Sequence, residues 1–189
     1  MENTRQGLLV VLSSPSGGGK TTVIKKILDM RPDDYVYSVS MTTRPKRPAE
    51  TDGVDYFFVS RDEFERQIQN GGLLEYETVH GYYYGTPRAP LNSWIEKGHV
   101  VLLDIDVYGA KRVKEQFQES LLIFIKPPDE RVLIERLKNR STESEKQIEK
   151  RLERFPEEME QANYFDYVIL NDDLSKTIEY VTNIIEAQR

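Results

Sequence analysis

The sequence contains no cysteine, only two histidines and no long apolar run. The absence of cysteine excludes disulfides and cysteine-ligated zinc, and it is compatible with a reducing cytosol. The histidines, His80 and His99, are far apart in the sequence, which argues against a histidine metal site. Apolar runs such as residues 8–12 are too short for a signal-peptide core and far below the roughly 18 residues of a membrane helix. We therefore expect a cytoplasmic protein without a membrane segment.

A general excess of positive charge is also missing. The 189 residues include 26 Lys and Arg against 32 Asp and Glu, so the net charge is −6. Nucleic-acid-binding domains are usually basic, so we expect no nucleic-acid partner, and we infer no obligate protein partner. The basic cluster at residues 44–47 instead indicates a site for a small anion. The length suits one compact domain over residues 1–189.

Dense apolar segments alternate with helical patterns along most of the chain. The predicted strands are LLVVLS (8–13), HVVLLDI (99–105), LLIFIKP (121–127) and YVIL (167–170). Helical patterns occupy residues 21–30, 107–117, 128–140 and 175–188. Apolar strands separated by helices indicate a parallel sheet covered on both faces, which is a three-layer α/β core. We place this core at about residues 1–34, 88–139 and 164–189.

Residues 35–87 have a different pattern and predict a small mixed β lobe inserted into the core. The segments YVYSVS, YFFV, LLEYETV and YYYG alternate or are rich in aromatic residues, which favours short, partly antiparallel strands. One helix interrupts them, because Ser60 and Glu63 form a capping box and Gly71-Gly72 follows DEFERQIQ as a stop signal.

Residues 140–163 are highly charged and have few apolar side chains. The segment contains helix-capping signals at Thr142/Glu145 and Ser144/Gln147. A helical segment with little contact to the core is a candidate moving lid. Pro156 lies inside the helical pattern, and we expect it to kink or break the helix.

The segment SSPSGGGKTT (13–22) is typical of a phosphate-binding P-loop. It follows a predicted strand and precedes a predicted helix, so backbone N–H groups and the helix N-terminus can face an anion. Lys20 can reach the β and γ phosphates of a nucleotide, and the Thr21 hydroxyl can bind Mg²⁺. The alternative is a glycine-rich turn that binds nothing. The phosphate-binding residues that we predict are Ser14, Pro15, Ser16, Gly17, Gly18, Gly19, Lys20, Thr21 and Thr22.

A carboxylate at the end of a second apolar strand normally supports the metal of a P-loop. The run VVLLD supplies Asp104, which we predict to bind the metal together with Thr21, and Asp106 follows two residues later. The alternative for either acid is a helix cap or a solvated loop.

The P-loop alone does not select a class of enzyme. The sequence has neither an NKxD-type base-reading loop, which a GTPase needs, nor the LSGGQ-like signature of a transporter ATPase. A small-molecule kinase needs a second anion site facing the P-loop. The segment SVSMTTRPKRPAETDGVDYFFV (38–59) combines hydroxyls, a basic cluster, carboxylates and aromatics, and it is the candidate for that site.

Over nearly its whole length the sequence resembles the guanylate kinases, P-loop enzymes that transfer a phosphoryl group from ATP to GMP. The motifs that carry the resemblance are SPSGGGKT, SVSMTTRPKRPAETDGVDY, GYYYGT, LLDIDVYG, ERLKNRSTESEKQIEKRL and ILNDD. The resemblance implies a P-loop NTPase core, a nucleoside-monophosphate-binding lobe and a helical lid. It implies ATP as phosphoryl donor, Mg²⁺ as metal ion and GMP as acceptor.

The resemblance also assigns roles to individual residues. Arg44 and Arg47 would bind the GMP phosphate, helped by Tyr56 and Tyr84. Guanine would face Ser40, Glu75 and Thr86, whereas Glu50 and Asp106 would lie at the nucleotide or hold its arginines. Asn171 would lie near the adenine of ATP, and the lid would supply Arg136, Arg140 and Arg151 to the phosphates. The sequence departs from the family pattern at Ser14, Ala49 and Ser141. We expect retuned affinity from these changes, without loss of function.

The chemistry of guanine fits a carboxylate at position 75. Guanine presents its N1–H and N2–H₂ donors side by side, and a carboxylate can accept both, whereas a hydroxyl can donate to O6. Adenine has an acceptor at N1 and no N2 amine, so the same carboxylate would face a lone pair. Sites built on such hydrogen bonds reject the wrong partner by about 10⁴–10⁵. From the residues alone, Glu75 could also be an exposed strand acid.

The transfer itself needs no general base, because the attacking phosphate oxygen is already ionised near neutral pH. Catalysis would consist of positioning and charge neutralisation by Lys20, the metal ion and the arginines. The alternative for Arg136, Arg140 and Arg151 is a basic surface stripe that pairs with nearby glutamates.

Two other functions of the whole chain are alternatives to a guanylate kinase. A catalytically inactive guanylate-kinase-like module could use Arg44, Arg47, Tyr56 and Tyr84 to hold a phosphorylated peptide, but it would not need Lys20, Thr21 and the lid arginines. A ribose bisphosphate kinase of the same fold would not need the guanine-reading residues.

Overall fold

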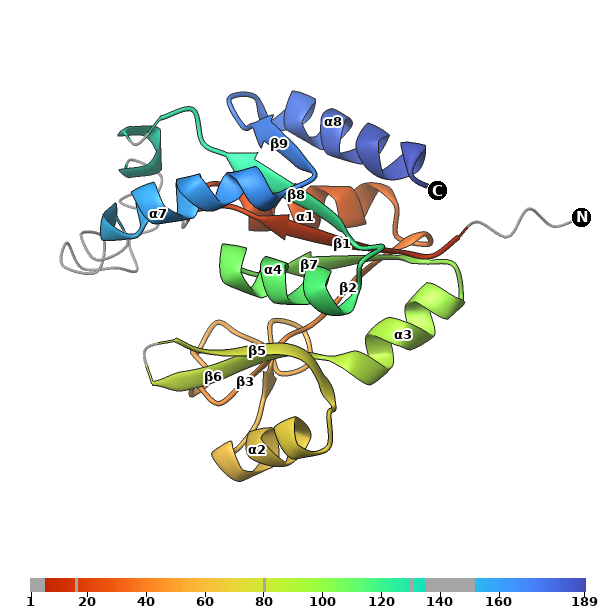
Figure 1. Cartoon of the computed structure of the whole chain (residues 1–189), viewed down its shortest axis with the longest axis vertical. Coiled ribbons are helices and arrows are strands. Elements are labelled where there is room, and N and C mark those ends of the chain that lie inside the picture. Colours follow the sequence, from red (N-terminus) through yellow and green to blue (C-terminus); the bar gives the residue numbers. More distant parts are fainter. Residues whose placement is uncertain (1–5, 16, 80, 130, 135–151) are drawn as a thin grey trace, which may run out of the picture.

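The computed structural model describes residues 6–15, 17–79, 81–129, 131–134 and 152–189. A five-stranded sheet in strand order β2-β7-β1-β8-β9 forms the centre of the molecule (Figure 1). All of its neighbouring strands are parallel, as the continuous apolar segments predicted. The strands are β1 (Leu8–Ser13), β2 (Tyr35–Tyr37), β7 (Val100–Asp104), β8 (Leu121–Lys126) and β9 (Tyr167–Leu170).

Helices cover both faces of this sheet, which confirms the three-layer core. Alternate residues of β1 point to opposite faces, so Val10 packs into one hydrophobic cluster and Val11 into the other. The first cluster includes side chains of α1 (Lys20–Met30) and α8 (Leu174–Ala187). The second includes side chains of α3 (Arg88–Glu96), α4 (Val107–Gln116) and the 3₁₀ turn η1 (Gln161–Tyr164).

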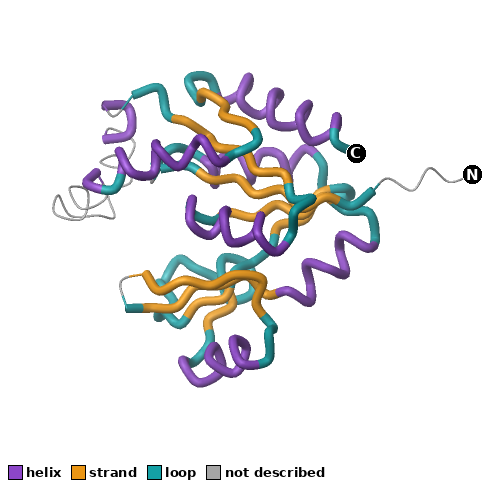
Figure 2. Tube along the Cα trace, viewed as in Figure 1, coloured by secondary structure: helices purple, strands orange, loops and turns teal. Residues whose placement is uncertain are grey.

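A second, four-stranded sheet lies beyond α4 and carries α2 on its far side (Figures 1 and 2). Its order is β4-β3-β6-β5, with β3 and β4 parallel and the other pairs antiparallel. The elements are β3 (Met41–Thr42), β4 (Phe57–Phe58), α2 (Arg61–Gln69), β5 (Leu73–Val79) and β6 (Tyr82–Pro87). The predicted mixed β lobe is therefore present.

The Ser60 half of the predicted capping box of α2 and its glycine stop are present, whereas the Glu63 carboxylate accepts from Arg66 and Gln67. The Ser60 hydroxyl accepts from the Glu63 N–H at 3.2 Å, and Gly71 follows the helix with φ of 64°. Phe64 of α2 is fully buried and stacks on Tyr83 of β6 with ring centroids 5.2 Å apart. This contact fixes α2 on the second sheet.

One strand lies elsewhere than its sequence pattern predicted. We expected the segment YVYSVS in the small lobe, but Tyr35–Tyr37 forms β2 at the edge of the parallel sheet, beside β7. An edge strand of a parallel sheet can alternate in exposure, as an antiparallel strand does. Tyr35 is buried there and donates its hydroxyl to Glu186 of α8 at 2.7 Å.

The helical pattern breaks near Pro156, as predicted. Residues 152–153 are helical, Arg154 is a turn, and α7 (Phe155–Glu160) begins with Pro156 in its first turn. Proline is tolerated there because the first N–H groups of a helix need no intrahelical partner. The remainder of the predicted lid, including Arg136, Arg140 and Arg151, lies outside the described residues. Within the described ranges, no helix has the length and apolar character that crossing a membrane requires.

Candidate functional site

The P-loop connects β1 to α1 and curls through glycines that adopt left-handed backbone conformations. Gly17 has φ of 89° and Gly19, the N-cap of α1, has φ of 99°, which residues with a Cβ rarely adopt. A Cβ on Gly18 would lie 2.8 Å from the Cβ of Ser14, so this position also requires glycine. The turn leaves the N-terminus of α1 open to an anion. Ser16, another predicted P-loop residue, is outside the described residues.

Ser14 fits the loop although the family pattern suggested glycine at this position. Its side chain is 5% exposed, and its hydroxyl donates to the Pro15 carbonyl at 3.0 Å. The space for it exists because Gly18 has no side chain. The loop therefore accommodates Ser14 by packing, with its hydroxyl satisfied locally.

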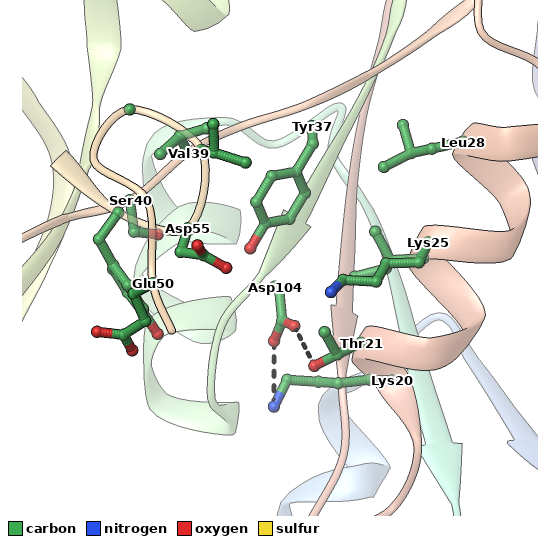
Figure 3. Close-up of a pocket in the computed structure, with 14 residues that line it drawn as sticks. Lys20, Thr21, Lys25, Leu28, Tyr37, Val39, Ser40, Glu50, Asp55 and Asp104 are labelled. Carbon is green, nitrogen blue, oxygen red and sulfur yellow. Dashed lines mark hydrogen bonds and ion pairs between the residues drawn. The ribbon is translucent and has the colours of Figure 1, made fainter. Parts of the chain in front are cut away.

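Asp104, Lys20 and Thr21 meet at the carboxyl ends of two neighbouring strands. Leu12 of β1 pairs with Asp104 of β7, so the P-loop leaves the sheet beside this carboxylate. The Thr21 hydroxyl donates to Asp104 Oδ2 at 2.8 Å, and Lys20 Nζ lies 3.1 Å from Oδ1 (Figure 3). The sequence predicted that these three residues serve one phosphate and metal site, and the structure brings them together.

The pair Thr21 and Asp104 fits a Mg²⁺ ion. Magnesium is usually bound through one or two carboxylates, with water and substrate phosphates completing its shell. A hydroxyl and a carboxylate oxygen 2.8 Å apart are suitable protein ligands for such a site. Elsewhere in the described chain, no three acidic or histidine side chains gather into a ready-made metal site.

Asn171 packs behind the P-loop. Its side chain is 3% exposed, its Nδ2 donates to the Gly18 carbonyl at 2.9 Å, and its Oδ1 accepts from the Thr177 hydroxyl at 3.1 Å. These bonds connect the P-loop to the β9–α8 turn. The adenine contact suggested by the resemblance stays a prediction.

The basic cluster of the second lobe is held by Glu50. Arg44 donates to Glu50 through both terminal nitrogens, at 3.0 and 2.7 Å, and the Arg47 backbone N–H donates to the same carboxylate at 2.8 Å. This pairing lowers the pKa of Glu50 and raises that of Arg44, so both stay charged. Glu50 thus holds one of the arginines, which is one of the two roles that the resemblance allowed.

Aromatic rings support the Arg44 guanidinium. It lies over the rings of Tyr56 and Phe58, with its carbon 5.5 and 5.6 Å from their centroids. Tyr84 contacts Tyr56 edge to face, with centroids 5.9 Å apart, and after Glu50 it contributes to the raised pKa of Arg44. Burial raises the pKa of Tyr56 to about 12, so its hydroxyl remains a hydrogen-bond donor at neutral pH. These contacts fix the position of the Arg44 guanidinium, which the sequence predicts to bind an anion.

Glu75 is a buried carboxylate on β5, not an exposed strand acid. It is 7% exposed, and its Oε1 accepts from the Thr86 hydroxyl at 2.8 Å. Burial raises the pKa of Glu75, whereas Thr86 and Arg112 lower it. Thr86 therefore donates to Glu75 in this structure, and Asp106 accepts from the Gly109 N–H at 2.8 Å as the N-cap of α4.

The two halves of the site face each other across a cavity of about 590 Å³. Lys20, Thr21 and Asp104 line one side, and Ser40, Glu50 and Tyr56 line the other. Figure 3 shows Asp104 beside the P-loop residues, with Ser40 and Glu50 across the cavity. Arg44 does not line this cavity itself, but it is paired with Glu50, which does.

Sequence reasoning missed several residues at this site. Tyr37 points its hydroxyl into the cavity from β2, and Lys25 and Asp55 also line it (Figure 3). Burial, followed by the Asp104 charge, raises the pKa of Tyr37. Arg112 of α4, which is beside Glu75, was also missed. The apolar strand pattern around Tyr37 and the ordinary helical pattern around Arg112 carry no local signal of a site.

Comparison with known proteins agrees with this geometry. The family model described as "Guanylate kinase" matches residues 6–188. The guanylate kinase of Streptococcus thermophilus (strain CNRZ 1066) is 48% identical over 98% of this chain and 88% of its own length. That of Latilactobacillus sakei subsp. sakei (strain 23K) is 43% identical over 98% of this chain and 91% of its own. The crystal structure of guanylate kinase from Anaplasma phagocytophilum superposes with a TM-score of 0.78 and 37% identity, over 97% of this chain and 86% of that one.

Proposed function

The chain belongs to the guanylate kinase family, and we propose that it transfers the γ-phosphoryl group of ATP to GMP, giving ADP and GDP, with Mg²⁺ as the metal ion. The observation that carries the proposal is the pairing of two anion sites across one cavity. The P-loop with Lys20 forms the first. The Arg44–Glu50 assembly forms the second, and it meets the cavity through Glu50.

The P-loop side suits the donor nucleotide. Lys20 would neutralise the phosphates, and the N–H groups at the start of α1 would orient them. Thr21 and Asp104 would hold Mg²⁺, which when bound neutralises charge on the transferring phosphoryl group. Asn171 keeps the P-loop fixed against α8, so the donor site is preorganised.

The second lobe suits the acceptor nucleotide. Arg44 and Arg47 would bind the phosphate of GMP, helped by the hydroxyls of Tyr56 and Tyr84. Ser40 lines the same cavity, and Glu75 with Thr86 would read the guanine edge. The acceptor phosphate oxygen would then attack the γ-phosphorus without a protein base, because it is ionised near neutral pH.

The lid completes the proposed mechanism. Arg136, Arg140 and Arg151 would approach the transferring phosphoryl group when the lid closes, and one arginine of this kind contributes about 10³–10⁵ in rate. A phosphopeptide-binding module would have no use for the Lys20–Asp104–Thr21 assembly, so we favour the enzyme. The cytoplasmic location and the absence of nucleic-acid, membrane and obligate protein partners stay predictions.

Two substitutions test the proposal, one on each side of the cavity. We expect Lys20→Ala to lower kcat by at least about 10³ through loss of charge neutralisation. Arg44→Met should raise the KM for GMP by about 10², because a charge-assisted phosphate contact is lost.

Two exposed cations supply the controls, one on the same helix as Lys20 and one in the same lobe as Arg44. Lys26→Ala on α1 and Arg66→Met on α2 remove the same charge away from the cavity, and both should keep wild-type kinetics. Full activity in a folded Lys20→Ala or Arg44→Met protein would contradict the proposal. Circular dichroism and thermal unfolding confirm that each variant is folded.

A further inference from the structure

We propose that Arg112 is a positioning residue for guanine recognition, because its guanidinium, carried by the core helix α4, keeps the buried Glu75 ionised and oriented. The inference rests on the proposed function and adds a residue that no motif of the sequence indicated. Arg112 itself would not contact the reacting atoms. It would act through Glu75.

Arg112 bridges two acids of β5. Its NH2 lies 2.7 Å from Glu77 Oε2 and 3.6 Å from Glu75 Oε2. Glu75 and Glu77 are two residues apart on one strand and therefore share a face of the sheet. The Glu75 side chain is 6% exposed, against 29% for Glu77. Glu75, the acid more distant from Arg112, is therefore the one with less access to solvent.

A buried carboxylate needs a neighbouring cation to stay charged. Among the described residues, the polar groups that face Glu75 are the Thr86 hydroxyl from β6, and Arg112 and the Asp106 carboxylate from α4. Asp106 opposes ionisation of Glu75, and Glu77 competes for Arg112. Arg112 supplies positive charge that, together with the hydrogen bond from Thr86, partly offsets burial and the charge of Asp106.

These contacts leave some hydrogen-bond acceptor sites of the Glu75 carboxylate available to a ligand. A carboxylate offers about four lone-pair sites. Thr86 occupies one on Oε1, and Arg112 at 3.6 Å from Oε2 is beyond hydrogen-bond distance, so it acts by charge. The remaining sites can accept the N1–H and N2–H₂ donors of guanine.

A gain in the stability of the fold does not explain the position of Arg112. Arg112 Nε is buried and has no hydrogen-bond partner among the described residues, which is costly for a donor of this kind. Gly109 permits the close approach of α4, since a Cβ there would lie 3.2 Å from Glu75 Oε2. The core helix thus approaches the acceptor lobe at the carboxylate that would read the base.

Steady-state kinetics of three variants test the inference. Arg112→Met should raise the KM for GMP about tenfold at pH 7.5, with kcat and the KM for ATP changed less than about threefold. Arg112→Lys, which restores a cation, should recover most of the loss. Lys111→Met removes the same charge from the neighbouring position of α4, whose ammonium lies over Tyr164, and should match wild type.

The pH dependence separates a charge effect from a general disturbance of the lobe. Burial already raises the pKa of Glu75, and loss of Arg112 raises it further, so less of the carboxylate is ionised as the pH falls toward 6. The ratio of variant to wild-type KM for GMP should therefore increase from pH 8 to pH 6. Taking the ratio cancels the titration of the GMP phosphate, whose second pKa is about 6.

The outcomes distinguish the two proposals. If wild-type protein does not phosphorylate GMP, the proposed function fails and this inference fails with it. If wild type is active but Arg112→Met keeps the wild-type KM for GMP, only the role of Arg112 is overturned. A pH-independent KM ratio, or an equal rise in the KM for ATP, would overturn it too, because either result indicates a merely structural residue.

Discussion

At the scale of single residues, Glu75 combines deep burial with a negative charge. Its carboxylate is 7% exposed and is held by Thr86 at 2.8 Å, with Arg112 further away. Because burial raises its pKa, the folded state binds this proton more tightly than the unfolded state does. Its contribution to stability therefore decreases as pH rises from the ordinary glutamate pKa of about 4.3 through the folded-state value.

Glu75→Gln separates stability from recognition. At pH 7 we expect the variant to have a Tm equal to or above that of wild type, because no charge is buried. We expect the KM for GMP to rise by at least about 10², because the amide NH₂ meets the donors of guanine. Thermal unfolding and kinetics at one pH test both effects. A marked fall in Tm with unchanged GMP kinetics would show that Glu75 is structural only.

At the scale of elements, the P-loop depends on the turn between β9 and α8. Asn171 connects the Gly18 carbonyl to Thr177 of α8, so the P-loop and α8, which are distant in sequence, are joined by hydrogen bonds. Lys20 and Thr21 begin α1 directly after this loop. The geometry of the donor site is therefore set partly by residues that do not face the cavity.

Asn171→Ala should weaken the donor site selectively. Loss of these buried hydrogen bonds should lower the free energy of unfolding by about 1–3 kcal/mol. The KM for ATP should rise several-fold, while the KM for GMP stays near wild type, because the Arg44 site has its own support. Urea unfolding and both KM values provide the measurement. An equal effect on the two substrates would mean that Asn171 does not act through the P-loop.

Some elements of the fold could be predicted from the sequence, because their burial leaves a recognisable pattern of apolar residues. Continuous apolar runs identified β1, β7 and β8, because strands buried on both faces leave that pattern. β9 is also an apolar run, but it is an edge strand in which Ile169 alone is buried. β2 was misplaced because it is a short edge strand in which only Tyr35 is fully buried, so its segment lacks the dense apolar pattern of the central strands. Arg44 was indicated by its basic cluster, whereas Glu75 could be found only through the resemblance. Arg112 could not be found at all, because its contacts to β5 are tertiary and leave no local pattern.

At the scale of the whole molecule, the proposed donor and acceptor sites belong to different sheets. The P-loop belongs to the parallel sheet, Arg44 and Glu75 belong to the second lobe, and the cavity of about 590 Å³ lies between them. Transfer requires both sites to be filled together, so acceptor choice reports on the entire assembly. If only the P-loop side were intact, the protein could hydrolyse ATP. It would not discriminate among acceptor nucleotides, because the residues that bind them would be missing.

The most direct measurement is ADP release by wild-type protein from ATP and Mg²⁺, with GMP, AMP, UMP, CMP and ribose 1,5-bisphosphate offered in turn. We predict rapid turnover with GMP and rates with the other four acceptors that are lower by about 10³ or more, because only guanine satisfies Glu75. Comparable turnover with AMP or ribose 1,5-bisphosphate would contradict base reading by Glu75. Absence of turnover with every acceptor, from folded protein that still binds GMP, would contradict the assignment as a kinase.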